Sequence, residues 1–473
     1  MNGRSTPGGE EPVAPALLAD ELDATEIPDA EATDPGRPLA GSFGATAFIQ
    51  LLQAVIAVVL ARALGPDGRG ELAAVILWPT AIMTLGNLGL AQATTYHAAR
   101  TPRLGALVGS TLAIVAAESL LLVGVGVAIL PLALSGHEAD VVRTAQLYLL
   151  VFVPLSLLAL GTMSILNGLH RFRWFHGLRV LLIGTTFAGI VALGVTGNMT
   201  IRSAAAVYAG AYLVVALVAT TVVLRAMEGA LRASRRTIRS LLSFGLKSQL
   251  STTMWALNER ADQLVISVFL SSASLGLYVV AVTMTSLTTL IGFSFALVAL
   301  PLLARMGPGR ERQRTARTIA AATIIGGAIV SIPLLIAEPL LIDLLFGESF
   351  SGSVDVGRVL LLAAMVFALN RVLEALLQAE GRPLDSSLGE AIGLAVTAAG
   401  LALLLPLLGI MGAGVTSLLA YATSAAFLTR RAARALGISP ARLLAPDREM
   451  LASFAALAAS GRAALRRRRP ADV

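Results

Sequence analysis

The sequence predicts an all-α membrane protein of about twelve transmembrane helices, arranged as two pseudo-symmetric six-helix lobes around a central cavity. Composition is the first observation behind this prediction. Apolar residues make up 56% of the 473 residues and charged residues only 14%, whereas a soluble domain carries about 25% charged residues. The mean hydropathy is +0.78. Much of the exterior is therefore expected to face lipid.

A series of apolar runs between Gly41 and Arg431 is the second observation. A spanning helix needs about 20 mostly apolar residues. Twelve segments qualify: 42–62, 71–93, 106–131, 144–167, 178–196, 203–225, 241–270, 275–303, 317–337, 356–378, 386–408 and 411–429. Pro339 is expected to end the ninth segment, because proline interrupts the hydrogen bonding of a helix. Residues 340–346 would then form a short interfacial turn or helix.

An internal repeat is the third observation. Gly70 in GRGELAAV and Gly276 in SLGLYVVAV are 206 residues apart, and each opens the helix after an apolar one. Gly168 and Gly381 are 213 apart and end the fourth and tenth segments. A repeat at half the length of the membrane region predicts two related lobes with a substrate path between them.

These patterns divide the chain into five parts. Residues 1–40 hold nine acidic residues and no apolar period, which predicts a disordered tail. The other parts are an N-terminal lobe (41–225), a basic linker (226–240), a C-terminal lobe (241–431) and a basic tail (432–473). Arginines gather in the loops after even-numbered segments. By the positive-inside rule, both termini are expected to lie in the cytoplasm. The protein itself is expected in the cell membrane.

Several chemistries are not expected. The chain has no cysteine, and its four histidines show no metal-ligand spacing. The sequence contains no nucleophile–base pattern and no loop large enough to form a catalytic domain. An enzyme is therefore not expected, and neither is a cofactor. The four consecutive arginines of the C-terminal tail, Arg466 to Arg469, are not interleaved with aromatic residues, so the membrane is the expected partner and nucleic acid is not.

The membrane region resembles the polysaccharide-export flippases of the multidrug/oligosaccharidyl-lipid/polysaccharide exporter superfamily. Four stretches carry the resemblance: LARALGPDGRGELAAV (60–75), ERADQLVISVFLSSASLGLYVVA (259–281), LLFGESF (344–350) and LLPLLGIMGAGVTSLLAY (404–421). The resemblance implies transport of an undecaprenyl-pyrophosphate-linked oligosaccharide by alternating access, through a cationic central cavity. A polysaccharide polymerase or glycosyltransferases would be further candidate partners. Two alternatives remain, an ion-coupled multidrug exporter and a scaffold of a polysaccharide assembly complex.

Charges within the seventh segment are unusual, because a charge at the bilayer centre costs about 2.5–3.5 kcal/mol. At 100° per residue, Lys247, Ser251, Asn258 and Asp262 form one polar stripe, which predicts a cavity-lining face. Glu259 and Gln263 extend this side, and Arg260 points nearly opposite. A buried ion-pair network, and a Lys247 that reaches to the membrane surface, are the structural alternatives.

The embedded residues suggest roles in such a transporter. The cations are candidates for a pyrophosphate headgroup: Lys247, Arg260 and Arg371. The carboxylates are candidates for coupling to a proton or a sodium ion: Asp262, Glu118 and Glu259. Polar side chains are candidates for the cavity wall: Gln50, Gln53, Asn87, Ser251 and Asn258. Arg371 can instead pair with Glu374 on one helix face, and Glu118 can hydrogen-bond to a neighbouring segment.

Overall fold

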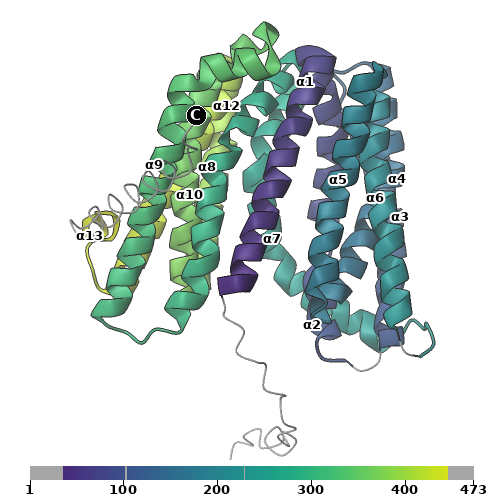
Figure 1. Cartoon of the computed structure of the whole chain (residues 1–473), viewed down its shortest axis with the longest axis horizontal. Helices are drawn as coiled ribbons and strands as arrows, with labels where there is room; N and C mark the ends of the chain where they lie inside the picture. The colour runs from purple at the N-terminus through teal and green to yellow at the C-terminus, as the bar shows by residue number, and fades with distance from the viewer. Residues whose placement is uncertain (1–35, 102–103, 228, 446–473) are drawn as a thin grey trace, which may run out of the picture. The chain divides into compact units, whose positions relative to one another are not determined.

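The computed structural model describes residues 36–101, 104–227 and 229–445, and every regular element within these ranges is a helix (Figure 1). The bundle of packed helices lies in the unit that begins at Ala45. The acidic tail predicted for residues 1–40 and the arginine-rich end of 432–473 lie mostly outside the described residues.

The described residues in the first half of the chain form six α-helices. They are α1 (Gly36–Gly86), α2 (Leu90–Ala98), α3 (Leu104–Ala133), α4 (Ala139–Gly168), α5 (Phe172–Thr196) and α6 (Ile201–Ala226). The second half contains α7 (Arg235–Phe269), α8 (Ser272–Ala304), α9 (Arg310–Phe346), the 3-10 helix η1 (Glu348–Ser353), α10 (Val354–Ala379), α11 (Pro383–Leu408), α12 (Ile410–Leu436) and α13 (Pro440–Leu444).

Helix α1 consists of two helices that meet at Gly65. The φ angle of Gly65 is 65°, a left-handed conformation that glycine adopts without a steric cost. Arg62 precedes Gly65 and contacts the end of α9, and Gly70 follows it and contacts the start of α8. Both residues therefore lie near the same end of the bundle. The two halves of α1 are therefore two membrane segments that run in opposite directions.

The structure confirms the predicted all-helical membrane fold. Ten helices in the described residues are long and apolar enough to cross a membrane. This set counts the two halves of α1 once, and it omits α7, which carries the embedded charges. The second half of α1 and α7 bring the membrane segments to the predicted twelve.

Helix α9 differs from the prediction. It continues through Pro339 to Phe346, so the expectation that Pro339 ends the ninth segment is wrong. Proline removes one backbone donor, but membrane helices tolerate it where neighbouring groups supply hydrogen bonds. Arg62 donates to the carbonyl oxygens of Leu344 and Leu345, which lie in the last turn of α9. These bonds stabilise the helix end beyond the proline.

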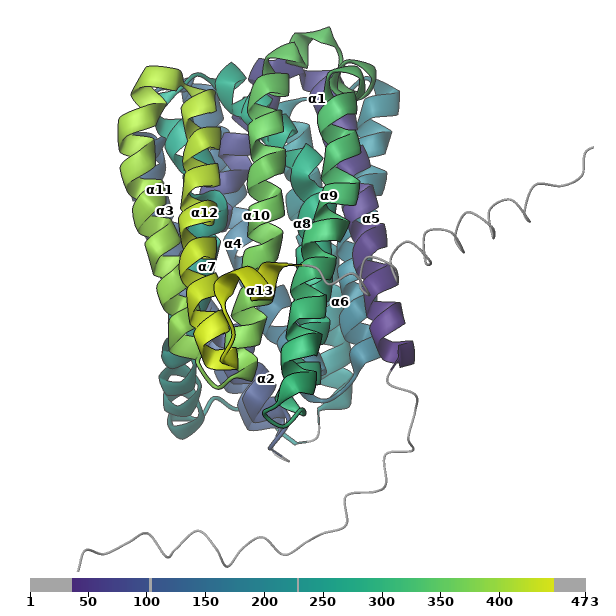
Figure 2. The same ribbon diagram turned by 90° about the vertical axis from the view of Figure 1, so that its left-hand side faces the viewer.

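The helices from Ala45 onward pack as two groups. Helices α2–α6 pack on one another, and α8–α12 form the second group, in which α10 contacts α8, α9 and α12 (Figure 2). The most buried membrane segments are α4 and α10, in which 61% and 67% of the residues of the most apolar stretch are buried. These two helices hold equivalent positions in the repeat, as expected of pseudo-symmetric lobes.

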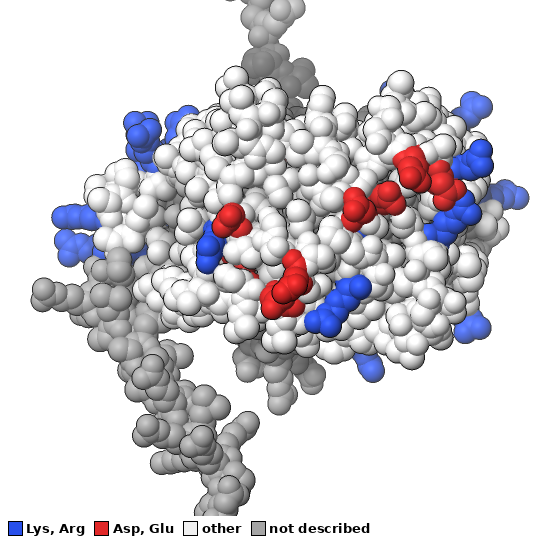
Figure 3. Space-filling view, turned by 90° about the horizontal axis from the view of Figure 1, so that it is seen from above, with Lys and Arg blue, Asp and Glu red and all other residues white. Residues whose placement is uncertain are grey.

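The two ends of the bundle differ in charge. We call the end with the turns at 99–101, 169–171, 229–234, 305–309 and 380–382 the basic end. Helix α7 begins there at Arg235, inside the predicted linker, because the helix extends beyond its apolar part. The opposite end is seen in Figure 3, where acidic side chains gather over the middle of the face. This end includes Glu71, and Asp67, Glu138 and Asp140 lie close enough to repel its carboxylate.

The two repeat-related glycines contact each other at the opposite end. A β-carbon on Gly70 would lie 1.7 Å from the carbonyl oxygen of Ser272 and 2.9 Å from the nitrogen of Gly276. A β-carbon on Gly276 would lie 2.0 Å from the carbonyl oxygen of Pro66. Here the backbones of α1 and α8 meet with no side chain between them, as small residues allow between membrane helices.

We therefore predict that Gly276→Val separates the lobes at the opposite end. The chain has no native cysteine, so spin labels can be attached to Asp67→Cys and Ser271→Cys. Double electron–electron resonance would then measure the distance between the two labels. The variant should shift the distance distribution to longer values. Gly327→Val is the matched control, because a β-carbon there meets nothing within 4 Å. An unchanged distribution in Gly276→Val would contradict the contact.

Candidate functional site

A cavity of about 530 Å³ lies between the two lobes. Its wall includes residues of α1, α5 and α6 on one side and of α7, α8, α10 and α12 on the other. Because both lobes contribute, a change in their relative position would change the shape of the cavity. This is the location that the internal repeat predicts for a substrate path.

Hydrogen-bonding side chains cover much of the wall. The first lobe and α7 contribute amides and hydroxyls: Gln50, Gln53, Thr186, Tyr208, Tyr212 and Gln263. The second lobe contributes hydroxyls: Thr283, Thr285, Ser286, Thr289, Ser417 and Tyr421. Such groups can bind a ligand that carries many hydroxyls, and apolar residues such as Phe293 and Phe367 complete the wall.

Four charged residues line the cavity: Arg69, Glu259, Arg260 and Asp262. Glu259 and Arg260 are exposed, and neither forms an ion pair with another described residue. Arg69 begins the second half of α1, and its Nε is buried without a hydrogen-bond partner among the described groups. The two arginines come from different lobes and line the same cavity.

Asp262 is held by its neighbours in the second lobe. The Tyr278 hydroxyl donates to Oδ2, and the Ser417 hydroxyl lies 3.5 Å from the same oxygen. The Gln263 N–H donates to Oδ1 at 2.7 Å. Asp262 is only 8% exposed, so these contacts replace the water that a buried carboxylate needs. They also join α7 to α8 and α12.

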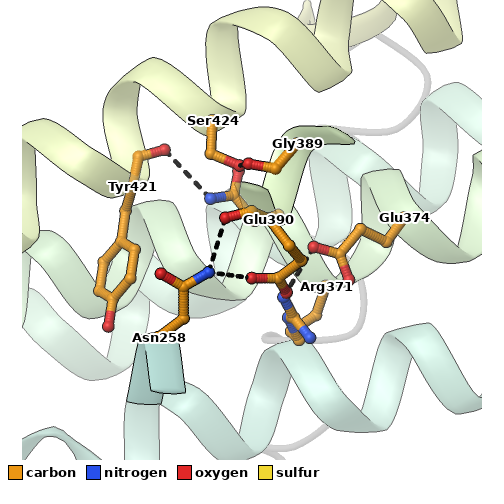
Figure 4. A network of polar contacts seen from close by, with 8 residues as sticks. Asn258, Arg371, Glu374, Gly389, Glu390, Tyr421 and Ser424 are labelled. Atoms are coloured by element: carbon orange, nitrogen blue, oxygen red, sulfur yellow. Dashed lines mark hydrogen bonds and ion pairs between the residues drawn. The ribbon is translucent and has the colours of Figure 1, made fainter. Parts of the chain in front are cut away.

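A second polar network lies next to the cavity (Figure 4). Arg371 contacts Oε1 of Glu374 at 2.7 Å and also pairs with Glu390. Asn258 donates to the carbonyl oxygen of Glu390 at 2.9 Å and to its carboxylate. The predicted Arg371–Glu374 pair is therefore formed, and the network joins α7, α10 and α11. Arg371 and Asn258 are not among the cavity-lining residues, because both side chains turn toward these carboxylates.

Helix α7 also contacts the first lobe. Gln249 donates to the carbonyl oxygen of Thr84 at 2.9 Å, and the Trp78 indole donates to Ser267 at 3.0 Å. Near the basic end, a β-carbon on Gly245 would lie 2.2 Å from the carbonyl oxygen of Leu88. One helix thus makes polar and close backbone contacts with both lobes.

Two predicted residues lie at the break between α1 and α2. Asn87 accepts a hydrogen bond from the N–H of Leu90 at 3.0 Å, which stabilises the first turn of α2. Glu118 accepts from the N–H of Leu88 at 3.3 Å, and its other carboxylate oxygen has no partner within the described ranges. Neither residue lines the cavity, since both bond to the interrupted backbone. The coupling role of Glu118 stays a prediction.

The predicted stripe on α7 is divided among different surroundings. Lys247 is exposed in a separate pocket near the basic end, Asn258 faces α11, and Asp262 lines the cavity. Arg260, expected on the other side, also lines the cavity. The placement of the Ser251 side chain lies outside the described residues. A helical projection groups residues by angle, but it cannot show that the neighbours of α7 change along its length.

Sequence reasoning missed Arg69 and the tyrosines of α6. Arg69 lies in the loop between the first two predicted segments, within the stretch 60–75 that carries the family resemblance. Tyr208 and Tyr212 recur at four-residue spacing on one face of α6, and that pattern could have indicated them. Across the described part of the chain, no group of three His, Asp or Glu side chains is placed to hold a metal ion.

The two-lobed helical bundle and its polar central cavity define a multi-pass membrane protein with a transporter-like architecture. The chain is similar to the lipid II flippase MurJ in an inward closed conformation, with a TM-score of 0.71 and 14% identity over 82% of this chain and 87% of that chain. It is also similar to an inward-facing multidrug resistance MATE family transporter of the MOP superfamily, with a TM-score of 0.65 and 15% identity over 82% and 96% of the two chains. A third similar structure is the MATE multidrug transporter DinF-BH, with a TM-score of 0.57 and 15% identity over 86% and 98%. These similarities show a shared fold.

A family model described as polysaccharide biosynthesis protein matches residues 41–307. The match covers more than half of the chain, which therefore belongs to this family. No curated protein matches the chain.

We predict that Arg371→Ala strongly destabilises the fold. The substitution leaves Glu374 and Glu390 buried without a countercharge, and breaking a buried pair in this way costs about 3–5 kcal/mol. Arg202→Ala is the control, because Arg202 and Asp140 form an exposed surface pair that contributes at most about 1 kcal/mol. Thermal unfolding in detergent should show a much larger fall in Tm for Arg371→Ala. Equal falls would contradict a structural role of the network.

Proposed function

We propose that the protein is a flippase that moves an undecaprenyl-pyrophosphate-linked oligosaccharide from the cytoplasmic to the outer leaflet of the cell membrane, for polysaccharide biosynthesis. The observation that carries the proposal is the hydroxyl-rich cavity between the lobes, with Arg69 and Arg260 on different lobes. The polysaccharide biosynthesis family and the fold shared with a lipid II flippase support it.

The chemistry of the cavity suits each part of this substrate. Arginine binds phosphate oxygens through paired N–H groups, so Arg69 and Arg260 would hold the pyrophosphate. The hydroxyl and amide side chains would bind the sugars, and the prenyl chain would remain in the lipid. A cavity of about 530 Å³ is in the range of sites for drug-sized ligands. An oligosaccharide headgroup would therefore require a wider state of the protein.

Alternating access would supply that wider state. In this proposal the basic end is cytoplasmic, in agreement with the positive-inside rule. The Gly70–Gly276 contact would close the outer side while the headgroup is loaded, and it would open during export.

Uphill transport requires coupling to a proton, a sodium ion or the membrane potential. The carboxylates to test are Asp262 and Glu259 in the cavity and Glu118, which contacts the break between α1 and α2. Polysaccharide polymerases or glycosyltransferases would be partners in the membrane.

An ion-coupled multidrug exporter is the second candidate. Glu259 and the aromatic residues Tyr421, Phe293 and Phe367 could bind an organic cation in the same cavity. The fold shared with multidrug transporters of the MATE family supports this candidate. The flippase is favoured because Asp262 is occupied by Tyr278 and Ser417, whereas both arginines lack ion-pair partners among the described residues.

We predict that Arg69→Ala and Arg260→Ala each slow flipping by about tenfold or more, since a charge-assisted hydrogen bond contributes about 1.5–3 kcal/mol. Purified protein in proteoliposomes would receive fluorescent undecaprenyl-pyrophosphate oligosaccharides with several glycans, and leaflet exposure would be followed by quenching. Arg202→Ala is the control, because Arg202 forms an exposed pair with Asp140 and does not line the cavity.

Two outcomes would reject the flippase, and a third would reject the proposed headgroup site. Uptake of a cationic dye against an ion gradient, with no flipping of any glycan, would support the exporter. Polysaccharide export in cells that survives the combined Arg69→Ala and Arg260→Ala substitutions would support a scaffold that does not transport. Equal flipping by Arg202→Ala and Arg260→Ala would show that the cavity does not bind the headgroup.

A further inference from the structure

A second pocket, of about 420 Å³, lies at the basic end between α2 and α7. We call it the basic-end pocket. Residues from these two helices line it: Tyr96, His97, Arg236, Arg239, Ser240, Ser243, Phe244 and Lys247. The α7 residues recur at spacings of three and four, so they form one face of the helix. The pocket is separate from the central cavity, and the proposed function does not use it.

Aromatic contacts build the wall of this pocket. The Tyr96 ring stacks on Phe244 with ring centres 4.4 Å apart. The Arg100 guanidinium lies 4.3 Å from the centre of the Tyr96 ring and donates to its hydroxyl. His97 is within hydrogen-bond distance of Ser240, at 3.2 Å. These contacts join α2 to α7 and give the pocket a defined shape.

The charges in the pocket lack an anionic partner among the residues that the structure describes. Arg236, Arg239 and Lys247 are exposed, and none forms an ion pair with another described residue. No lining residue is acidic. The first turn of α7 also has no acidic residue, although the helix macrodipole is positive there and favours anions. The unbalanced charge at this site would be relieved by a bound anion.

The position of the pocket indicates the kind of anion. Tyrosine beside arginine and lysine is typical of the level of the lipid headgroups. Arginine binds phosphate oxygens bidentately and lysine binds them as a point charge, and the serine hydroxyls could donate further hydrogen bonds. The volume is large enough for a small polar ligand.

We propose that the basic-end pocket binds the phosphate-bearing headgroup of an anionic membrane lipid. Arg239 and Lys247 hold the phosphate group, and Tyr96 and Phe244 contact the part of the headgroup next to it. The headgroup is either that of a polyprenyl pyrophosphate, which would place a receiving site beside the transport path, or that of an anionic phospholipid. The positive-inside rule explains the sign of these charges, but it does not explain their convergence on one aromatic-walled pocket.

Binding can be measured without transport. Full-length protein in a neutral detergent would be titrated with undecaprenyl pyrophosphate, phosphatidylglycerol or inorganic pyrophosphate, and native mass spectrometry would count the bound molecules. Every protein would carry Arg260→Ala, which weakens the central cavity site. The pocket variant adds Arg239→Gln and Lys247→Gln. The control adds Arg305→Gln and Arg310→Gln, which remove equal charge from exposed positions at the same end.

The pocket variant should weaken lipid binding by about tenfold or more, whereas the control should change it by less than about threefold. Preference for undecaprenyl pyrophosphate would identify a substrate-receiving site, and equal binding of phosphatidylglycerol would identify a phospholipid site. Equal losses in the two variants, or binding of inorganic pyrophosphate alone, would overturn the proposal. If the double substitution unfolds the protein, Lys247→Gln alone is compared with Arg305→Gln. Failure here would leave the flippase proposal intact, because the cavity is tested separately.

Discussion

The rest of the structure depends on the placement of α7, a polar helix, between two apolar lobes. Glu259, Arg260 and Asp262 would each be costly in contact with lipid. The second lobe supplies partners for Asp262, and the cavity gives Glu259 and Arg260 a polar surrounding. The first lobe contacts the same helix through Thr84 and Trp78. A movement of one lobe relative to the other must therefore change the contacts of α7, the helix that carries three of the four charged residues that line the cavity.

Contacts between glycines are the second constraint. Gly70 meets Gly276 at one end, and at the other end Gly89 meets Gly245, where a β-carbon on Gly89 would lie 2.1 Å from the Gly245 carbonyl oxygen. Backbone contacts of this kind order no side chains, so they can form and break without the entropy cost of fixing rotamers. Their location at both ends of α7 suits a protein in which the two sides of the cavity open in turn. The polar network around Arg371 instead keeps α7, α10 and α11 together as one rigid part.

The sequence was sufficient to predict the fold, because the length of each span is set by the bilayer and the repeat is visible in the chain itself. It paired Gly70 with Gly276 as equivalents, but it could not show that they touch. The site was less predictable. Arg371 and Asn258 were placed near the substrate from their polarity, and their partner Glu390 lies on another helix, so only the tertiary structure reveals the network. Arg69 was missed for the reverse reason, because a loop arginine at the end of a segment gives no sign that it turns inward.

The most direct measurement is a cryo-electron microscopy structure of the protein in lipid nanodiscs with an undecaprenyl-pyrophosphate-linked oligosaccharide. The account predicts density for the pyrophosphate between Arg69 and Arg260, with sugar density along the hydroxyl-bearing face of α8. It also predicts that α7 keeps its contacts with α11 through Asn258 while its contacts with the first lobe change. Density for the ligand only outside the cavity, or a cavity that stays closed and empty at saturating ligand, would contradict the account.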